Sequence, residues 1–201
     1  IEVFDNARHG ETCTDPACFG SMADAIMPRQ NTQNRKDSPF LRHRKLRVSF
    51  DIDDTLTRHR SQASAERELL PRIVHRWLGE PLRCGTVALM RELRRLGCSI
   101  WIYTSSGRSP FYIRRWLLLH GIRVDGVVND VRHRNCLAIH GFTHSPSKFP
   151  PAFGIDLHVD DSDGVRMEGE AHGFRVVVVQ PGDDSWTQRV LDAVLHWQSK
   201  T

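Results

Sequence analysis

Residues 47–57 read RVSFDIDDTLT, an apolar, strand-like run that ends abruptly in three carboxylates and two hydroxyls. In an open sheet of parallel strands, ligands bind just outside the carboxyl ends of the strands. Acidic side chains at the end of a buried strand therefore lie where such a sheet holds its functional groups. The stretch predicts the first strand of an α/β sheet, with a polar site at its carboxyl end.

The chain after this stretch alternates between helix-like and strand-like segments. Helices are expected over 86–96, 110–120, 165–172 and 185–197, strands over 99–103, 124–128, 153–159 and 174–179, and a long loop over 132–151. Strands that alternate with helices imply crossover connections and a mostly parallel sheet. The predicted fold class is α/β, a three-layer Rossmann-like sheet flanked by helices.

Two further regions differ from this alternating pattern. Residues 1–45 are polar and interrupted by prolines, and we expect them to form an N-terminal arm in front of a domain over 46–201. Residues 57–85 carry apolar positions at helical spacing and are expected to form a small, cap-like helical insertion after the first strand.

The overall composition is that of an ordinary globular protein. Of the 201 residues, 39% are hydrophobic and 26% are charged. No apolar run approaches the roughly 20 residues that a membrane span needs, and the first residues lack the layout of a secretory signal. Lys and Arg number 28 against 24 Asp and Glu, a net charge of +4 that favours anionic ligands without requiring nucleic acid.

The five cysteines are an odd number and are scattered along the chain, which argues against a disulfide framework and for a reducing, cytoplasmic compartment. In the arm, His9, Cys13 and Cys18 could supply three zinc ligands. Structural zinc sites usually have four ligands in paired short spacings, so two reduced cysteines are the favoured interpretation.

Functional side chains follow three of the predicted strands, and one more lies in the long loop. In this order, the combination resembles the haloacid dehalogenase (HAD) superfamily, and specifically its magnesium-dependent phosphatases. The resemblance covers about residues 46–180. Asp51-Ile-Asp53-Asp-Thr55 is similar to the first motif of the family, Thr104 to the second, Lys148 to the third, with Arg132 or Arg134 as alternatives, and Asp160-Asp161 to the fourth.

The resemblance implies distinct roles for the first-motif acids. Asp51 would attack phosphorus and form an aspartyl-phosphate, and Asp53 would protonate the leaving alcohol and then activate water. An acid at position 53 also distinguishes a phosphatase from the dehalogenases and the phosphorylated transport ATPases of the superfamily. Thr104 would donate a hydrogen bond to the phosphoryl group, and Lys148 would place a positive charge beside it.

The resemblance also implies a Mg²⁺ ion as cofactor. Its ligands would be Asp51, the backbone carbonyl of Asp53 and Asp161, with Asp160 as a supporting acceptor or partner of the lysine. Asp54 is expected to face away from the site.

Substrate contacts are expected from Ser105, Arg108 and Thr55, although Thr55 also suits a role in holding the turn. Arg58, His59, Arg60 and His133 are further candidate contacts, but for each of them a role as surface charge is the favoured interpretation. Because no folded lid is expected over 132–151, the site would be nearly open. It would admit a bulky phosphorylated substrate, or a small one if another subunit or the arm closes over it.

Two alternative functions remain open. One is a catalytically silent binding module that keeps the fold and the metal site. The other is a nucleic-acid end-processing phosphatase, which the basic run over 42–47 suggests. The expected partner is a phosphorylated small molecule or macromolecule; nucleic acid is not favoured, a membrane is not expected, and a homo-oligomer is compatible with the sequence.

Overall fold

The computed structural model describes residues 44–57, 65–66, 80–140 and 146–200. The chain separates into two units, Ile1–Arg42 and His43–Thr201. The predicted arm, with His9, Cys13 and Cys18, lies outside the described residues except for its last two positions, and so does most of the insertion expected over 57–85. The domain boundaries and the zinc hypothesis therefore stay predictions.

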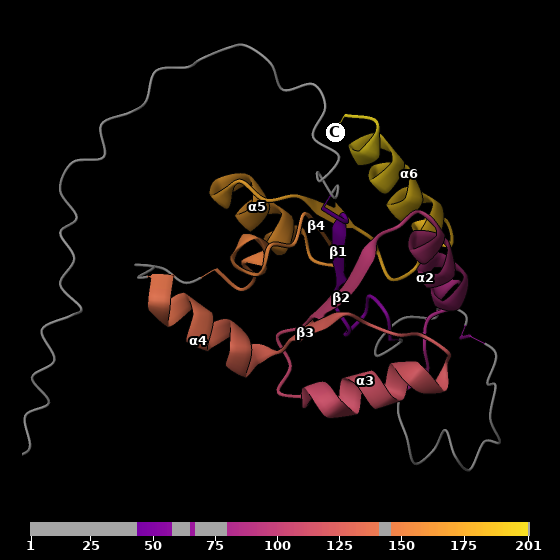
Figure 1. Ribbon diagram of the computed structural model, residues 1–201, viewed down its shortest axis with the longest axis horizontal. Coiled ribbons are helices and arrows are strands. Elements are labelled where there is room, and N and C mark those ends of the chain that lie inside the picture. Colours follow the sequence, from indigo (N-terminus) through magenta and orange to yellow (C-terminus); the bar gives the residue numbers. More distant parts are fainter. Residues whose placement is uncertain (1–43, 58–64, 67–79, 141–145, 201) are drawn as a thin grey trace, which may run out of the picture. The chain divides into compact units, whose positions relative to one another are not determined.

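Five parallel strands form one sheet in the order β3-β2-β1-β4-β5 (Figure 1). Their bounds are Arg47–Phe50 for β1, Ser99–Tyr103 for β2, Gly126–Val128 for β3, Leu157–Asp160 for β4 and Val176–Val178 for β5. The chain adds β2 and β3 on one side of β1 and β4 and β5 on the other. The strand order thus reverses beside β1, which is where open α/β sheets form their ligand crevice.

The helices cover both faces of the sheet, which confirms the α/β fold class. They are α2 (Thr86–Arg95), α3 (Pro110–Leu119), α4 (Asp130–His140), α5 (Asp163–His172) and α6 (Trp186–Gln198), with a short 3-10 helix over Pro150–Phe153. In Figure 1, α2 and α6 lie on one side of the sheet, and α4 and α5 lie on the other. Apolar side chains of α2, α3 and α6 form the main core with the sheet.

Alternation along the strands separates an apolar face from a polar one. Val48 and Phe50 of β1 are fully buried in the main core, while Ser49, between them, points to the opposite face and bonds to His158 of β4. Successive strand residues point to opposite faces, so the spacing alone puts Ser49 and His158 beyond the reach of the main core. Buried polar groups on this second face lead directly to the carboxyl end of the sheet.

The loop expected over 132–151 is wrong in its first part, because α4 occupies Asp130–His140. Asp130 lies in the first turn and pairs with Arg134 one turn later at 2.6 Å, which stabilises the helix. Among the side chains of α4 whose burial is described, over residues 130–139, His133 and Leu137 are the buried ones, so the apolar period that identifies a helix in the sequence is weak here. Pro150–Phe153 likewise forms a 3-10 helix, so β4 begins later than expected.

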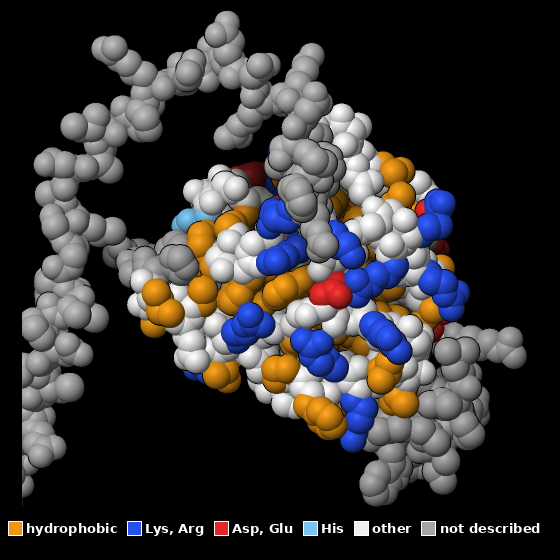
Figure 2. Space-filling model, viewed as in Figure 1, with side chains coloured by type: hydrophobic (Ala, Val, Ile, Leu, Met, Phe, Trp, Pro, Cys, Tyr) orange, Lys and Arg blue, Asp and Glu red, His pale blue; other side chains and the backbone are white. Residues whose placement is uncertain are grey.

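Lys and Arg side chains are spread over the face shown in Figure 2, with apolar side chains between them. This agrees with the modest positive charge of the chain and its pI near 9.0. Within the described residues, no helix is both long enough and apolar enough to cross a membrane. The three cysteines of this part, Cys84, Cys98 and Cys136, are free thiols.

Candidate active site

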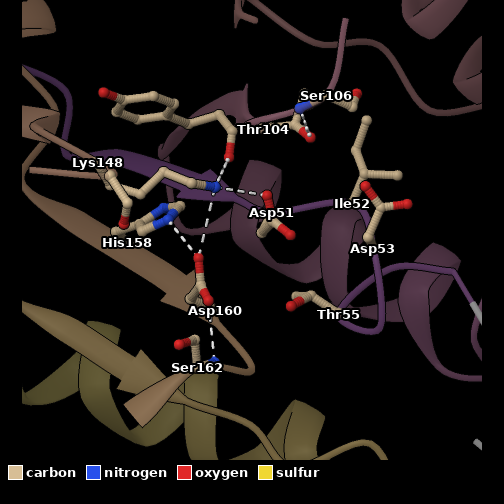
Figure 3. Close-up of polar contacts among 12 residues, drawn as sticks. Asp51, Ile52, Asp53, Thr55, Thr104, Ser106, Lys148, His158, Asp160 and Ser162 are labelled. Atoms are coloured by element: carbon tan, nitrogen blue, oxygen red, sulfur yellow. Dashed lines mark hydrogen bonds and ion pairs between the residues drawn. The ribbon is translucent and has the colours of Figure 1, made fainter. Parts of the chain in front are cut away.

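Side chains from four segments meet at the carboxyl end of the sheet (Figure 3). Asp51 follows β1, Thr104 follows β2, and Asp160 ends β4. Phe50 is in register with Ile102 on one side and with Val159 on the other, so Asp51 and Asp160 start from the same level of the sheet and Thr104 starts one residue beyond it. The amide of Asp51 donates to the Val159 carbonyl at 2.9 Å, which fixes the backbone of Asp51 against β4.

Lys148 reaches this point from the segment before the 3-10 helix, and its ammonium group contacts three acceptors. Nζ donates to Asp51 Oδ1 at 2.6 Å and to the Tyr103 carbonyl at 3.0 Å, and it lies 3.6 Å from Asp160 Oδ2. The side chain is almost completely buried. Buried charges need paired and hydrogen-bonded partners, and the ammonium group of Lys148 has them in two carboxylates and one backbone carbonyl.

Asp160 is held by a buried chain of polar groups. His158 Nε2 donates to Asp160 Oδ2 at 3.0 Å, and Nδ1 of the same ring lies 2.8 Å from the Ser49 hydroxyl. The amide of Ser162 also donates to Asp160 at 2.9 Å. Burial acts to raise the pKa of Asp160, but the His158 hydrogen bond, the charges of His158 and Lys148 and the Ser162 amide outweigh it and lower the pKa to about 2. Asp160 is therefore ionised at neutral pH.

Asp51 is in the opposite electrostatic situation. Burial raises its pKa, Lys148 opposes that effect, and the charge of Asp160 adds to it, so that the net shift is upward. A buried carboxylate with few stabilising hydrogen bonds is a stronger nucleophile than a solvated one, provided that nearby cations keep it ionised. Lys148 supplies one such cation.

Asp161 adds a further carboxylate next to Asp160. Burial is the first cause that raises its pKa to about 6, and the charges of Asp160, Asp51 and Asp54 are the others. The Thr55 hydroxyl donates to Asp161 Oδ1 at 3.4 Å, a long bond that links the turn after β1 to the end of β4. Thr55 is fully buried, so its contact supports the expected role in holding the turn more than a substrate contact.

The turn after β1 sends Asp53 to the other side of the site. Asp54 has φ 57, in the left-handed region that a non-glycine residue adopts only at some cost. Both oxygens of Asp53 accept bonds from Arg108, each at 2.9 Å, and Arg108 also donates to Glu80 at 2.6 Å. The hydrogen bond with Asp53 is the largest of the causes that raise the pKa of Arg108. Arg108, expected to contact substrate, is thus paired with the candidate general acid.

The residues after β2 form the top of the site. Thr104 is fully buried; its hydroxyl oxygen accepts a bond from the Ser106 amide at 3.2 Å, and its own amide donates to the Val128 carbonyl at 2.9 Å. The hydroxyl proton of Thr104 can still be donated to a ligand, because the bond from Ser106 uses only a lone pair. Ser105 is exposed beside it.

Neither arginine considered as an alternative to Lys148 contacts Asp51. Arg132 donates to the Val127 carbonyl and stacks on Trp101, and Arg134 pairs with Asp130. His133, considered as a substrate contact, is buried, and both of its ring nitrogens bond within the protein. Arg58, His59 and Arg60 lie outside the described residues.

In the part of the chain that the structure describes, no three side chains of His, Cys, Asp or Glu form a group that could hold a metal ion by themselves. The predicted Mg²⁺ ligands include only two side chains, the carboxylates of Asp51 and Asp161, together with the backbone carbonyl of Asp53. Asp160 is predicted as a supporting acceptor. Mg²⁺ usually keeps several waters and takes one or two carboxylates together with substrate phosphate.

Sequence reasoning missed the residues that support these groups, namely Ser49, Glu80, Tyr103, His158 and Glu168. A signal existed for His158, which precedes Asp160 by two strand positions and therefore shares its face. For Glu80 and Glu168 no signal existed, because their partners are 28 and about 20 residues away in the chain.

Comparisons with known proteins give similarity at the level of structure. No protein-family model and no curated protein matches the chain. A predicted HAD-like family hydrolase from Porphyromonas gingivalis is 12% identical over 77% of this chain and 98% of its own, with a TM-score of 0.40. The HAD domain of the effector protein Lem4 from Legionella pneumophila is 14% identical over 75% of this chain and 94% of its own, with a TM-score of 0.43.

A chain of the Pnkp1/Rnl/Hen1 complex is 15% identical, with a TM-score of 0.42 over 87% of this chain but only 58% of that chain. The names of two of these three structures include HAD.

Proposed function

We propose that this chain is a Mg²⁺-dependent phosphomonoester hydrolase of the HAD type that acts through an aspartyl-phosphate on Asp51. The contact that carries the proposal joins Lys148 Nζ to Asp51 Oδ1 at 2.6 Å, beside the carboxyl end of the central strand. A buried ammonium group against a buried carboxylate offers an incoming phosphoryl group a cation and a nucleophile at one point.

The roles of the other residues follow from their positions. Asp51 forms the bond to phosphorus as the ester oxygen departs. Asp53, in its protonated form and with one oxygen released from Arg108, gives that departing oxygen its proton. Asp53 then takes a proton from the water that hydrolyses the acyl phosphate. Lys148 and the Thr104 hydroxyl bind the oxygens of the transferring group, whose charge is spread over its three equatorial oxygens.

A divalent cation suits the charge of the site. Asp51 and Asp160 share the ammonium group of Lys148, and Asp161 adds a third carboxylate next to Asp160. Burial first, and then the charges of Asp160, Asp51 and Asp54, raise the pKa of Asp161 to about 6. Asp51, Asp161 and the Asp53 carbonyl would hold Mg²⁺ through oxygen atoms, the ligands that it prefers. When bound, the ion would neutralise charge on the phosphate and on the attacking carboxylate.

The test is hydrolysis of p-nitrophenyl phosphate with and without Mg²⁺, in the wild type and in Asp51→Asn. We expect metal-dependent turnover in the wild type and a loss of at least about 10³-fold in kcat for Asp51→Asn, since loss of a nucleophile removes the covalent route. Asp54→Asn is the matched control, because it makes the same chemical change three residues away. Asn tolerates the left-handed conformation of position 54, so activity should remain.

Other outcomes would select other functions. Most of the activity remaining in Asp51→Asn would show that Asp51 is not the nucleophile. A wild type that binds Mg²⁺ but turns over no phosphate ester with any divalent metal would be a silent binding module. Removal of a terminal phosphate from an oligonucleotide far faster than from a mononucleotide, with strong salt dependence, would indicate a nucleic-acid end-processing phosphatase.

A further inference from the structure

Resting on the proposed function, we propose that Glu168 of α5 is a positioning residue of the same site, which sets the place of Lys148 by binding the backbone beneath it. Glu168 does not contact Asp51 or the ammonium group in the site. Its carboxylate accepts three hydrogen bonds from two consecutive residues, Ser147 and Lys148. Lys148, which carries the charge, and Glu168, which binds its backbone, are thus on different elements.

The three bonds are closely spaced. The amide of Ser147 donates to Glu168 Oε1 at 2.9 Å, the Ser147 hydroxyl donates to Oε2 at 2.7 Å, and the amide of Lys148 donates to Oε2 at 3.3 Å. Hydrogen bonds to an ionised carboxylate are stronger than bonds between neutral groups. Both oxygens of Glu168 are used, so the direction of the backbone is fixed as well as its distance.

A second set of bonds holds the neighbouring backbone from the other side. The amide of Phe149 donates to the Tyr103 hydroxyl at 2.7 Å, and His133 Nε2 lies 3.1 Å from the Pro146 carbonyl. A carbonyl can only accept, so Nε2 carries the proton, and Nδ1 of the neutral ring accepts from the Tyr103 hydroxyl at 2.5 Å. Glu168, Tyr103 and His133 therefore bind four consecutive residues of the chain.

This segment needs such partners because it belongs to no strand. Residues 146–149 lie between α4 and the 3-10 helix, where no neighbouring strand fixes the backbone. The long side chain of Lys148 then runs inward to Asp51 and the Tyr103 carbonyl. A misplacement of about 1 Å in a charged group at a reaction centre can cost a large factor in rate. The hydrogen bonds to residues 146–149 therefore hold the backbone of Lys148 where its ammonium group must act.

The first measurement is amide hydrogen exchange on the full chain, which does not depend on turnover. In Glu168→Ala, we expect exchange of the Ser147 and Lys148 amides to become at least about tenfold faster, because each loses its acceptor. The Phe149 amide, which donates to Tyr103, is the internal control and should keep its rate. Glu170→Gln is the matched variant: Glu170 is exposed on the same helix and binds Arg166.

The second measurement is steady-state hydrolysis of p-nitrophenyl phosphate with Mg²⁺. Glu168→Ala should lower kcat about tenfold with less than about a twofold change in KM, because Lys148 acts on charge that develops in the transition state. Glu168→Gln should recover part of the rate, since its amide oxygen still accepts. In a Lys148→Ala background, Glu168→Ala should cost less than about twofold more, because its effect passes through the lysine.

These results separate the inference from the function on which it rests. Unchanged exchange of the Ser147 and Lys148 amides in Glu168→Ala would overturn the backbone contact, whatever the activity. Faster exchange with unchanged kcat, or equal losses in the wild-type and Lys148→Ala backgrounds, would overturn the positioning role. A wild type without phosphatase activity would instead overturn the proposed function and with it the catalytic part of the inference.

Discussion

The two halves of the candidate site differ in burial and in how their charges are held. On one side, the side chains of Lys148, Asp51 and Asp160 are only 3%, 11% and 3% exposed. On the other, Arg108, Asp53 and Glu80 are 20%, 39% and 35% exposed. Both halves are networks of ion pairs, but only the first is shielded from water.

This difference matches the chemistry that each half would perform. Coulomb interactions are stronger where water is excluded, so the buried half suits attack on phosphorus and stabilisation of its charge. In the proposed mechanism, Asp53 would exchange a proton with a leaving alcohol and then with water, which requires access to solvent. Glu80 of the open half belongs to the segment 57–85, of which the structure describes residues 57, 65–66 and 80–85.

Breaking the buried half should have the largest effect. Lys148→Ala leaves Asp51 and Asp160 without their common cation, and we expect kcat to fall by about 10² to 10³ fold. The free energy of unfolding should also fall by about 3 kcal/mol, because removing one partner strands a buried charge. Activity assays and urea denaturation would measure both. Lys45 is exposed, so Lys45→Ala is the control. Equal effects of Lys148→Ala and Lys45→Ala would contradict the special importance of the buried half.

Breaking the open half should cost less. Arg108→Ala frees both oxygens of Asp53, and we expect kcat to fall about tenfold, a fraction of the 10² to 10⁴ that a general acid contributes. The free energy of unfolding should change by less than about 1 kcal/mol, because the pair is partly solvated. Arg108→Lys keeps the charge but not the two parallel bonds, so its kcat should lie between those of the wild type and Arg108→Ala. A loss as large as that of Lys148→Ala would show that the open half is equally critical.

The backbone segment that carries Lys148 of the buried half is also bound by His133, which should respond to acid. Burial lowers the pKa of His133 below its ordinary value of 6.5; the Pro146 hydrogen bond and the charges of Asp130 and Glu168 oppose this, and Lys148 reinforces it. The folded pKa lies below the unfolded one, so the contribution of His133 is complete above pH 6.5 and is lost as the pH falls toward the folded pKa. Urea midpoints at pH 8 and pH 5.5 should differ more in the wild type than in His133→Gln. An equal difference would contradict the prediction.

The smallest effect is expected from Glu80→Gln. Glu80 shares Arg108 with Asp53 and is about one third exposed. Partly exposed ion pairs contribute little, so we expect a change within about 0.5 kcal/mol in unfolding free energy and about twofold in kcat. Hydrolysis of p-nitrophenyl phosphate and urea denaturation would measure both changes. A gain in kcat of more than about twofold would show that Glu80 draws Arg108 away from a productive position.

Prediction from the sequence succeeded where the local pattern was strong. The strand at 47–50, the helix ending before Gly97 and the strand at 99–103 have clear apolar periods, and all three are present. The prediction failed at α4, whose buried residues are too few to give a period. Among the site residues, those that follow strands were found because they share one edge of a parallel sheet. Lys148 was found only through its resemblance to a family motif.

The sequence by itself determined the acidic end of the first strand, RVSFDIDDTLT, and with it the sheet and the edge at which functional groups gather. The resemblance to a family implied different roles for Asp51 and Asp53, but nothing in the sequence explained why their surroundings should differ. Only the tertiary structure decided that Asp51 pairs with Lys148 in a buried setting and that Asp53 pairs with Arg108 in a more open one. The physical reason is that burial and charge pairing depend on residues distant in the chain, such as Glu80, His158 and Glu168, which meet the site only after the chain has folded.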